Sequence, residues 1–239
     1  MQNRHRTALI LAGLLLPWAP LAMAAPAPPQ APDPPAFAIP QPGVPEVLSV
    51  KGKFLRVAYN DEGFVVVGFM SPNRAIGGEW MLLDFGATLL DKTPNYTLTR
   101  DAITLETPDG KTVPMASVID QRGGATEALQ WRAIRENPAM AYFPTFASEP
   151  CSIPFFYDEF ARLLPVGEVE LSVHRGCYGR IFFHLPGGIA LGQYWLNVKF
   201  AASVVRVPFT IMTPAEEQYV QENLEAIQKQ MEEAFPPTM

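Results

Sequence analysis

The sequence has few cysteines, few histidines and few basic side chains. Its 239 residues contain two cysteines, three histidines and 18 lysines and arginines, against 24 aspartates and glutamates. The formal net charge is therefore −6. Proteins bind nucleic acids and anionic membranes largely through lysine and arginine, so the composition favours neither partner. His174 lies three residues before Cys177, but no second pair at ligand spacing accompanies it, and we expect no metal site.

Long apolar runs are missing after residue 24, so we expect no membrane span. The first 24 residues have a different pattern. Arg4 and Arg6 precede an apolar run over residues 8–16, and small residues at 22–24 end the segment. This order is typical of a secretory signal peptide. We predict cleavage after Ala24 and a soluble periplasmic or secreted product.

Residues 25–46 contain nine prolines and almost no aliphatic pattern. A segment of this composition predicts an extended, polyproline-type linker. A binding role for the proline tract is the alternative, but most domains that recognise such tracts are cytoplasmic. We therefore interpret residues 25–46 as a spacer before the folded domain.

The two cysteines, Cys151 and Cys177, predict one disulfide, because an even pair in an exported protein is usually oxidised. The loop between them is long enough for the bond to stabilise the fold by about 3 kcal/mol through chain entropy. A reactive or metal-binding thiol pair is the alternative, and the sequence offers it no companion ligands.

Alternating apolar and polar residues dominate residues 47–212, as in half-buried strands. Two such rows follow each other and predict a hairpin around residues 201–203; they are Tyr194, Leu196, Val198 and Phe200, then Val205, Val207, Phe209 and Ile211. Pro208 cannot donate a ladder hydrogen bond, so it predicts a sheet edge or a bulge. Similar short strands are expected over residues 54–59, 64–70, 79–91, 103–105, 169–173 and 181–185, with turns at residues 60–63 and 109–110.

About eight short strands without helices between them predict an antiparallel β-sandwich. Residues 79–112 carry a more particular pattern: Trp80, an apolar strand, a polar break at 93–95, a second short strand and a turn at 108–111. This pattern resembles extracytoplasmic bacterial immunoglobulin-like domains of the telokin-like kind. The resemblance implies an immunoglobulin-like sandwich in a cell-envelope or secreted protein, and it implies no catalytic residues.

Residues 116–165 interrupt the strand pattern as an insertion within the sandwich domain. A short helix is expected at residues 125–137, ended by Pro138. The candidate ligand or partner surface follows it and consists of Tyr142, Phe143, Phe146, Phe155, Phe156 and Tyr157, with Phe160 beyond. These aromatic side chains predict either an added core over one end of the sandwich or an exposed patch for an apolar ligand or partner. We favour the added core.

The pattern changes again over residues 213–239. Thr213, Pro214 and Glu216 predict a helix start with a capping box, and the helix is expected to reach about Ala234. The candidate helix interface consists of Val220, Leu224, Ile227 and Met231, spaced as one narrow apolar seam. The seam predicts packing against the domain itself, and a homodimer through the same helix of a second subunit is the alternative.

Catalytic signatures are weak. After maturation only His174 and His184 could act as a histidine base, and no Gly-x-Ser-x-Gly or phosphate-binding loop occurs. Two carboxylate pairs, Asp158 with Glu159 and Asp84 with Asp101, lack a visible sugar-binding platform. We therefore expect no catalytic residues and no cofactor. The leading hypothesis is a non-enzymatic binding module of the cell envelope; the alternatives are a small apolar-ligand binder using the aromatic insertion and a hydrolase using His174 or His184.

Overall fold

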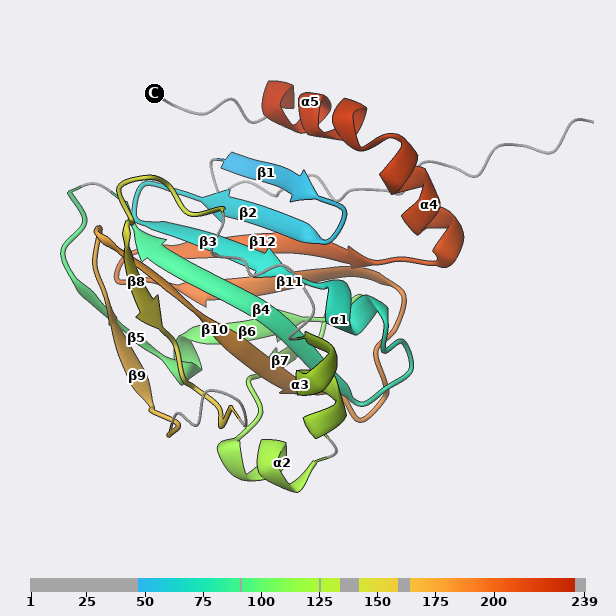
Figure 1. Ribbon diagram of the computed structural model, residues 1–239, viewed down its shortest axis with the longest axis horizontal. Coiled ribbons are helices and arrows are strands. Elements are labelled where there is room, and N and C mark those ends of the chain that lie inside the picture. The colour runs from blue at the N-terminus through green and yellow to red at the C-terminus, as the bar shows by residue number, and fades with distance from the viewer. Residues whose placement is uncertain (1–46, 91, 125, 134–141, 159–163, 235–239) are drawn as a thin grey trace, which may run out of the picture. The chain divides into compact units, whose positions relative to one another are not determined.

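The residues that the structure describes form two β-sheets, a two-stranded ribbon and several helices (Figure 1). The computed structural model describes residues 47–90, 92–124, 126–133, 142–158 and 164–234. The predicted signal peptide, residues 1–24, and the predicted linker, residues 25–46, lie outside the described residues. No helix among the described residues is both long enough and apolar enough to cross a bilayer.

The larger sheet has six strands. In spatial order they are β1 (Val47–Gly52), β2 (Leu55–Tyr59), β3 (Gly63–Gly68), β4 (Trp80–Leu89), β10 (Arg175–His184) and β8 (Glu149–Ser152). The smaller sheet has four, in the order β12 (Val204–Ile211), β11 (Gly192–Lys199), β6 (Ile103–Glu106) and β7 (Thr112–Pro114). The ribbon pairs β5 (Tyr96–Thr99) with β9 (Glu168–Leu171).

Helices occupy the connections and the C-terminus. They are α1 (Met70–Asn73), the 3-10 helix η1 (Arg100–Ala102), α2 (Val118–Gly123), α3 (Glu127–Ala133), α4 (Pro214–Glu222) and α5 (Leu224–Ala234). The prediction of a mainly β fold with antiparallel sheets and a C-terminal helix is thus confirmed. One strand pair departs from the pattern, because β8 runs parallel to β10.

The predicted turns form, and side-chain or backbone groups accept the hydrogen bonds of their N–H groups. The side-chain oxygen of Asn60 accepts hydrogen bonds from the backbone N–H groups of Glu62 and Gly63, at 3.0 Å each. Gly110 turns the hairpin between β6 and β7 with a φ of 81°, which a residue with a Cβ adopts at a cost. The backbone N–H of Phe200 donates to the carbonyl of Ser203 at the turn between β11 and β12.

Pro208 lies opposite Trp195 in the pairing of β12 with β11. β12 is an edge strand of the smaller sheet, so the N–H that proline lacks is not needed for a second ladder. The edge position predicted for Pro208 is therefore confirmed.

The two sheets share one hydrophobic core. The predicted apolar row of β4 is fully buried in it, and Met81, Leu83, Phe85, Ala87 and Leu89 are each 0% exposed. Leu196 and Val198 of β11 and Val207 and Phe209 of β12 belong to the same core. Burial of one such side chain stabilises a fold by roughly 1.5–3 kcal/mol, so the alternating rows fix which sheet faces meet.

The outer face of the larger sheet differs from the alternating pattern, because it is apolar as well. Leu55 and Val57 of β2 and Phe64 and Val66 of β3 form a second buried cluster there. Tyr142 and Phe143 of the insertion pack against this cluster. The insertion therefore covers a sheet face that would otherwise expose large apolar side chains.

Phe143 is accommodated by two glycines. A Cβ at Gly86 of β4 would lie 2.7 Å from the Phe143 ring, and one at Gly176 of β10 would lie 3.1 Å from it. The ring thus lies directly on the backbone of two neighbouring strands. Phe143 therefore packs as core, on the outer face of the larger sheet rather than over an end of the sandwich.

The predicted disulfide between Cys151 and Cys177 is present. The two residues are direct partners in the parallel pairing of β8 with β10, and their Cα atoms are 4.1 Å apart. Cys177 is completely buried. The bond therefore fastens the insertion to the larger sheet.

The C-terminal helix starts as predicted. The hydroxyl of Thr213 accepts from the backbone N–H of Glu216, and the carboxylate of Glu216 accepts from the backbone N–H of Thr213. The single helix expected to Ala234 is instead divided at Asn223 into α4 and α5. The side-chain amide of Asn223 donates to the carbonyl of Tyr219 at 2.9 Å, which competes with the regular helical hydrogen bonding.

The apolar seam of these helices packs on the domain. Val220 is 0% and Ile227 7% exposed, and Leu224 and Met231 pack against the same core. α5 contacts β1, at the edge of the larger sheet (Figure 1). The structure thus places the predicted interface inside the chain's own fold.

Candidate functional site

The aromatic residues of the insertion do not form one surface. Phe155 and Phe156 are buried in the main core, whereas Tyr142 and Phe143 cover the outer face of the larger sheet. Phe146 is 39% exposed, and Tyr157 is half-buried. Phe160 lies outside the described residues. The segment therefore serves mainly as core, and a different set of residues forms the candidate site.

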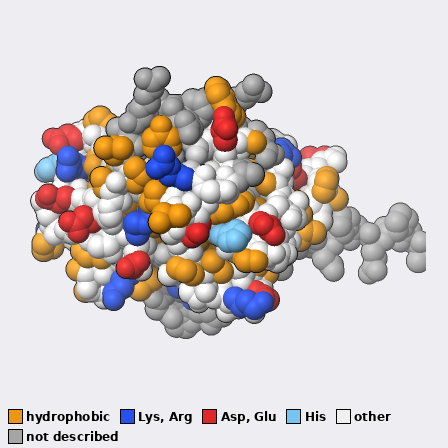
Figure 2. All heavy atoms as spheres, turned by 90° about the horizontal axis from the view of Figure 1, so that it is seen from below, with side chains coloured by type: hydrophobic (Ala, Val, Ile, Leu, Met, Phe, Trp, Pro, Cys, Tyr) orange, Lys and Arg blue, Asp and Glu red, His pale blue; other side chains and the backbone are white. Residues whose placement is uncertain are grey.

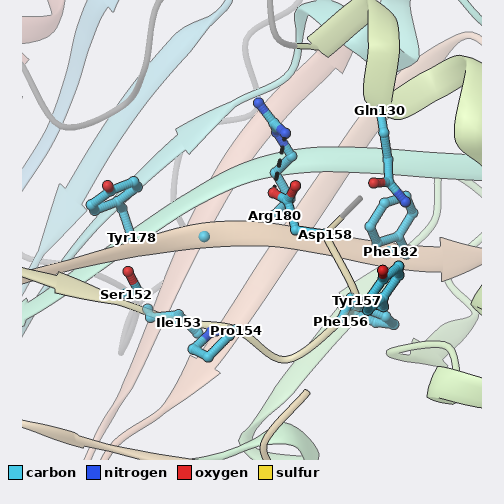
Figure 3. Close-up of a pocket in the computed structure, with 11 residues that line it drawn as sticks. Gln130, Ser152, Ile153, Pro154, Phe156, Tyr157, Asp158, Tyr178, Arg180 and Phe182 are labelled. Carbon is cyan, nitrogen blue, oxygen red and sulfur yellow. Dashed lines mark ion pairs between the residues drawn. The ribbon is translucent and has the colours of Figure 1, made fainter. Parts of the chain in front are cut away.

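The candidate site is a cavity of about 110 Å³ between the insertion and β10, which we call the insertion cavity (Figure 3). It lies along β10 beyond the residues that pair with β8. The backbone N–H of Ile153 donates to the carbonyl of Tyr178 as β8 ends, and the backbone N–H of Ala116 donates to the carbonyl of Phe182 further along. Its lining residues are Gln130, Ser152, Ile153, Pro154, Phe156, Tyr157, Asp158, Tyr178, Gly179, Arg180 and Phe182.

Arg100 of η1 contacts the backbone and the Phe156 ring next to this cavity. Its guanidinium donates to the carbonyls of Phe155 and Ala116, and it lies 4.4 Å from the centre of the Phe156 ring. Partial burial lowers the pKa of Arg100, but the group stays charged at neutral pH. The Arg100 side chain therefore links the insertion at Phe155 to the segment that follows β7 at Ala116.

A row of three charged side chains crosses the outer face of the larger sheet at the cavity. Arg180 of β10 is the cross-strand partner of Asp84 on β4. Its Nε lies 3.6 Å from Asp84 Oδ1, and its Nη1 lies 3.5 Å from Asp158 Oδ2. Figure 3 shows Arg180 and Asp158 next to each other above β10, with Tyr178 and Ser152 to one side and the other aromatic side chains and Gln130 to the other.

Asp84 is the most perturbed carboxyl of this row. Burial raises its pKa from 3.8 to about 6, and the attraction of Arg180 opposes that rise only in part. The Asp84 side chain is 16% exposed, so solvent compensates little. Asp84 is therefore ionised at pH 7 at a cost to the folded state.

Arg180 lies between two carboxylates, those of Asp84 and Asp158. Both of its carboxylate contacts are longer than the distance of about 2.7–2.9 Å that is typical of a charge-assisted hydrogen bond. The Arg180 side chain is 24% exposed and lines the insertion cavity.

The insertion carries several exposed apolar side chains. Of the eight large hydrophobic side chains that are exposed among the described residues, four belong to the insertion. They are Ile119 at 82%, Trp131 at 57%, Phe146 at 39% and Leu164 at 80%. Trp131 follows the lining residue Gln130 on α3. In Figure 2 the apolar side chains on the visible face stand among single charges of both signs, without a large basic patch.

Two further cavities lie outside the insertion cavity. One of about 260 Å³ is lined by Lys53, Phe54, Met70, Tyr142 and Asp84, among others, so Asp84 faces it from the side opposite to Arg180. The other, of about 490 Å³, is formed by the β6–β7 turn and the β10–β11 loop. Its lining is mostly apolar and includes Pro108, Val113, Leu185, Pro186 and Tyr194.

The residues considered for catalysis are not brought together. His184 stacks on Trp80 with ring centres 4.7 Å apart, and its Nε2 lies 3.9 Å from a carboxylate oxygen of Glu79. His174 is exposed at the start of β10. Neither histidine lines any of the three cavities described above.

The two carboxylate pairs considered for catalysis are not formed among the described residues either. Asp84 pairs with Arg180 rather than with Asp101, which is exposed on η1. Asp158 contacts Arg180, and its neighbour Glu159 lies outside the described residues. No group of three or more potential metal ligands occurs in the described part of the chain.

The sequence did not indicate Arg180 and Tyr178, because the strand expected over residues 181–185 begins after them, whereas β10 begins at Arg175. Their positions alternate with the buried Ile181 and Phe183, which marks them as outward-facing. The sequence carries no signal that pairs Arg180 with Asp84, because the pairing of β4 with β10 joins segments far apart in the chain. Comparison with protein-family models, with curated proteins and with solved structures finds no match for this chain.

Proposed function

We propose that the protein is a non-enzymatic binding module outside the cytosol, and that it docks a protein partner on the insertion. The observation that carries the proposal is that residues 116–165 hold four of the eight large exposed apolar side chains of the described residues and also line a cavity that contains Arg180 and Asp158. Large apolar side chains at the surface favour protein contacts, and interface energy concentrates where they meet a well-packed pocket. Arg, Tyr and Trp, which dominate such contacts, all occur here.

The proposed compartment rests on two observations. The N-terminal residues have the order of a signal peptide, and the disulfide between Cys151 and Cys177 is compatible with an oxidising space. An immunoglobulin-like sandwich of the telokin-like kind is the proposed class of the scaffold. The face-to-face packing of two mainly antiparallel sheets around one core supports it.

The docking proposal is tested by capture from the envelope and secreted fractions of the source organism. The mature protein is compared with an insertion variant, Ile119→Ser with Trp131→Ser, and with a matched control, Ile76→Ser with Leu191→Ser. The control residues are each 46% exposed and lie outside the insertion. We expect one protein to be captured by the mature form and the control but not by the insertion variant. Equal capture by all three forms, or none by any, would refute docking on the insertion.

A small apolar ligand is the second candidate, and one observation favours it. The cavity at the β6–β7 and β10–β11 loops has a volume of about 490 Å³, within the range of roughly 300–1,000 Å³ that is usual for small-molecule sites. It lies away from the aromatic insertion, where the sequence had placed such a ligand. Native mass spectrometry of protein purified from its own host should then show a bound species, and the mass of the bare protein alone would count against this candidate.

A further inference from the structure

We propose that the cavity between the β6–β7 turn and the β10–β11 loop, which we call the loop cavity, binds a free small molecule built on two or three fused aromatic rings. This inference rests on the second candidate function, a site for a small apolar ligand, and names the chemical class of that ligand. The rigidity of the two loops, the side chains of the walls and the volume of about 490 Å³ support it.

The β10–β11 loop is fixed by backbone contacts with the segment that precedes β4. The N–H of Gly77 donates to the carbonyl of Ile189, and the N–H of Ile189 donates to the carbonyl of Gly78, at 2.9 Å each. Gly188, which lines the cavity, has a φ of 80°, and a Cβ there would lie 2.8 Å from the carbonyl oxygen of Gly77. The fold therefore sets the position of this loop, and the cavity beside it is present before a ligand binds.

The wall formed by Tyr194 is held in place at both ends of its side chain. Its hydroxyl accepts from the backbone N–H of Ala190 at 2.9 Å and donates to the carbonyl of the same residue at 3.1 Å. The ring is 1% exposed and stacks on Phe209, with ring centres 5.6 Å apart. A preformed cavity of this kind favours a rigid ligand, because a flexible ligand loses conformational entropy when it binds.

The polar side chains in the described lining bond to one another. The hydroxyl of Thr107 donates to a carboxylate oxygen of Asp109, and the other carboxylate oxygen lies 2.6 Å from Nζ of Lys111. The side chains of Asp109 and Lys111 are also exposed to solvent. We therefore expect the apolar walls to supply most of the affinity for a ligand.

Rings make up much of the apolar wall. Pro108, Pro186 and Tyr194 are cyclic, whereas Val113 and Leu185 are branched. Proline rings pack against aromatic rings, as they do where aromatic grooves bind proline-rich segments. Two aromatic rings also attract each other beyond the effect of the area that they bury. A planar aromatic ligand gains from both contacts, whereas an aliphatic chain gains only from burial.

The volume of the loop cavity indicates the size of the ligand. A cavity of about 150 Å³ holds one benzene molecule, so a cavity of about 490 Å³ has room for two or three fused rings. A single benzene-sized ring on the side chain of a partner protein would fill about a third of it. The volume therefore favours a free molecule over a side chain.

The test compares two neutral alcohols of similar hydrophobicity, naphthylmethanol and n-heptanol, on the full mature protein. N-acetyltryptophanamide represents the side chain of a partner. Dissociation constants are measured by titration followed in ¹H–¹⁵N NMR spectra. We expect naphthylmethanol to bind about tenfold more tightly than n-heptanol, which corresponds to about 1.4 kcal/mol. The backbone signal of Gly188 should shift during the titration.

Two pairs of variants assign the binding to the loop cavity. Gly187 lines the cavity and Gly167 lines none of the three cavities, and a Cβ at either glycine would meet nothing within 4 Å. Gly187→Phe should weaken the binding of naphthylmethanol by about tenfold or more because it fills the space, and Gly167→Phe should not. Pro186→Ser should reduce the preference over n-heptanol to less than about threefold, whereas Pro94→Ser, at an exposed proline outside the cavity, should retain it. The same spectra show whether each variant is folded.

The outcomes separate this inference from the function on which it rests. Equal affinity for the two alcohols, weakened by Gly187→Phe, overturns the preference for fused rings and leaves a site for a small apolar ligand. Tighter binding of N-acetyltryptophanamide than of naphthylmethanol overturns the assignment to a free molecule. Binding that Gly187→Phe leaves unchanged, or no binding of any probe at millimolar concentration, also overturns the inference. Native mass spectrometry of protein from its own host then decides separately whether the second candidate function stands.

Discussion

Burial of Asp84 makes the stability of this protein depend on pH in an unusual direction. Its pKa is raised from 3.8 to about 6, so the folded state holds the proton more tightly than the unfolded chain does. Well below pH 3.8 the carboxyl is protonated in both states and burial costs little. As pH rises through 6, the folded state must hold a charge that the unfolded chain keeps in water. The contribution of Asp84 to stability is therefore lost as pH increases.

The size of the effect follows from the two pKa values. A tenfold difference in proton affinity is worth about 1.4 kcal/mol, so the difference between 3.8 and about 6 corresponds to about 3 kcal/mol above pH 7. Asp84→Asn removes this ionisation and keeps the shape of the side chain. The free energy of unfolding of the variant, relative to that of the unsubstituted protein, should rise by about 2 kcal/mol between pH 4 and pH 8.

Urea denaturation of both proteins at several pH values measures this difference. The pH dependence that both proteins share cancels in the comparison, and any pH-independent effect of the amide on Arg180 cancels as well. Asp61→Asn, at an exposed position, should show no comparable change. A gap between Asp84→Asn and the mature protein that stays constant from pH 4 to pH 8 would refute the reasoning.

Three further substitutions test the packing. Gly86→Ala should destabilise by about 1–3 kcal/mol because its Cβ would meet the Phe143 ring, whereas Gly187→Ala, whose Cβ meets nothing within 4 Å, should not; equal midpoints in urea would contradict this. Ile227→Ala should cost about 2–5 kcal/mol in the same assay if α5 is docked as described, and a loss under 0.5 kcal/mol would mean that it is not. Thr213→Ala should lower stability by about 1 kcal/mol, with Thr213→Ser restoring it.

Local chemistry made part of the fold predictable. Apolar residues recur at every second position from Met81 to Leu89, and they form a strand buried on that face. Thr213 and Glu216 cap a helix through contacts only three residues apart. Cysteine number and compartment alone indicated the disulfide. Each of these features depends on neighbours in sequence or on composition, which a single chain displays.

Long-range pairing explains what the sequence did not reveal. Arg56 alternates with apolar residues and would be expected at the surface, yet it is 2% exposed and donates to the carbonyls of Gly52 and Leu55. The carbonyls it needs exist only because β1 turns into β2 beside it. The break at Asn223 is equally hidden, since the apolar seam continues through it.

The candidate site shows the same limit. Asp84, Arg180 and Asp158 come from β4, β10 and the insertion, and only the assembled sheet brings them within 4 Å of one another in pairs. The aromatic segment drew attention to the insertion, but most of its rings became core. The polar residues of the cavity were found only once the neighbours of β10 were known.

The cross-link between β8 and β10 has a thermodynamic consequence for recognition. Because Cys151 is bonded to Cys177, the residues that follow it, Ile153 and Pro154, stay close to β10 even when nearby loops open transiently. The entropy of ordering this wall is spent while the chain folds and oxidises, before any partner arrives. A molecule that binds in the cavity therefore contacts a surface that is already ordered. The affinity of that molecule is not reduced by the entropy cost of ordering the surface.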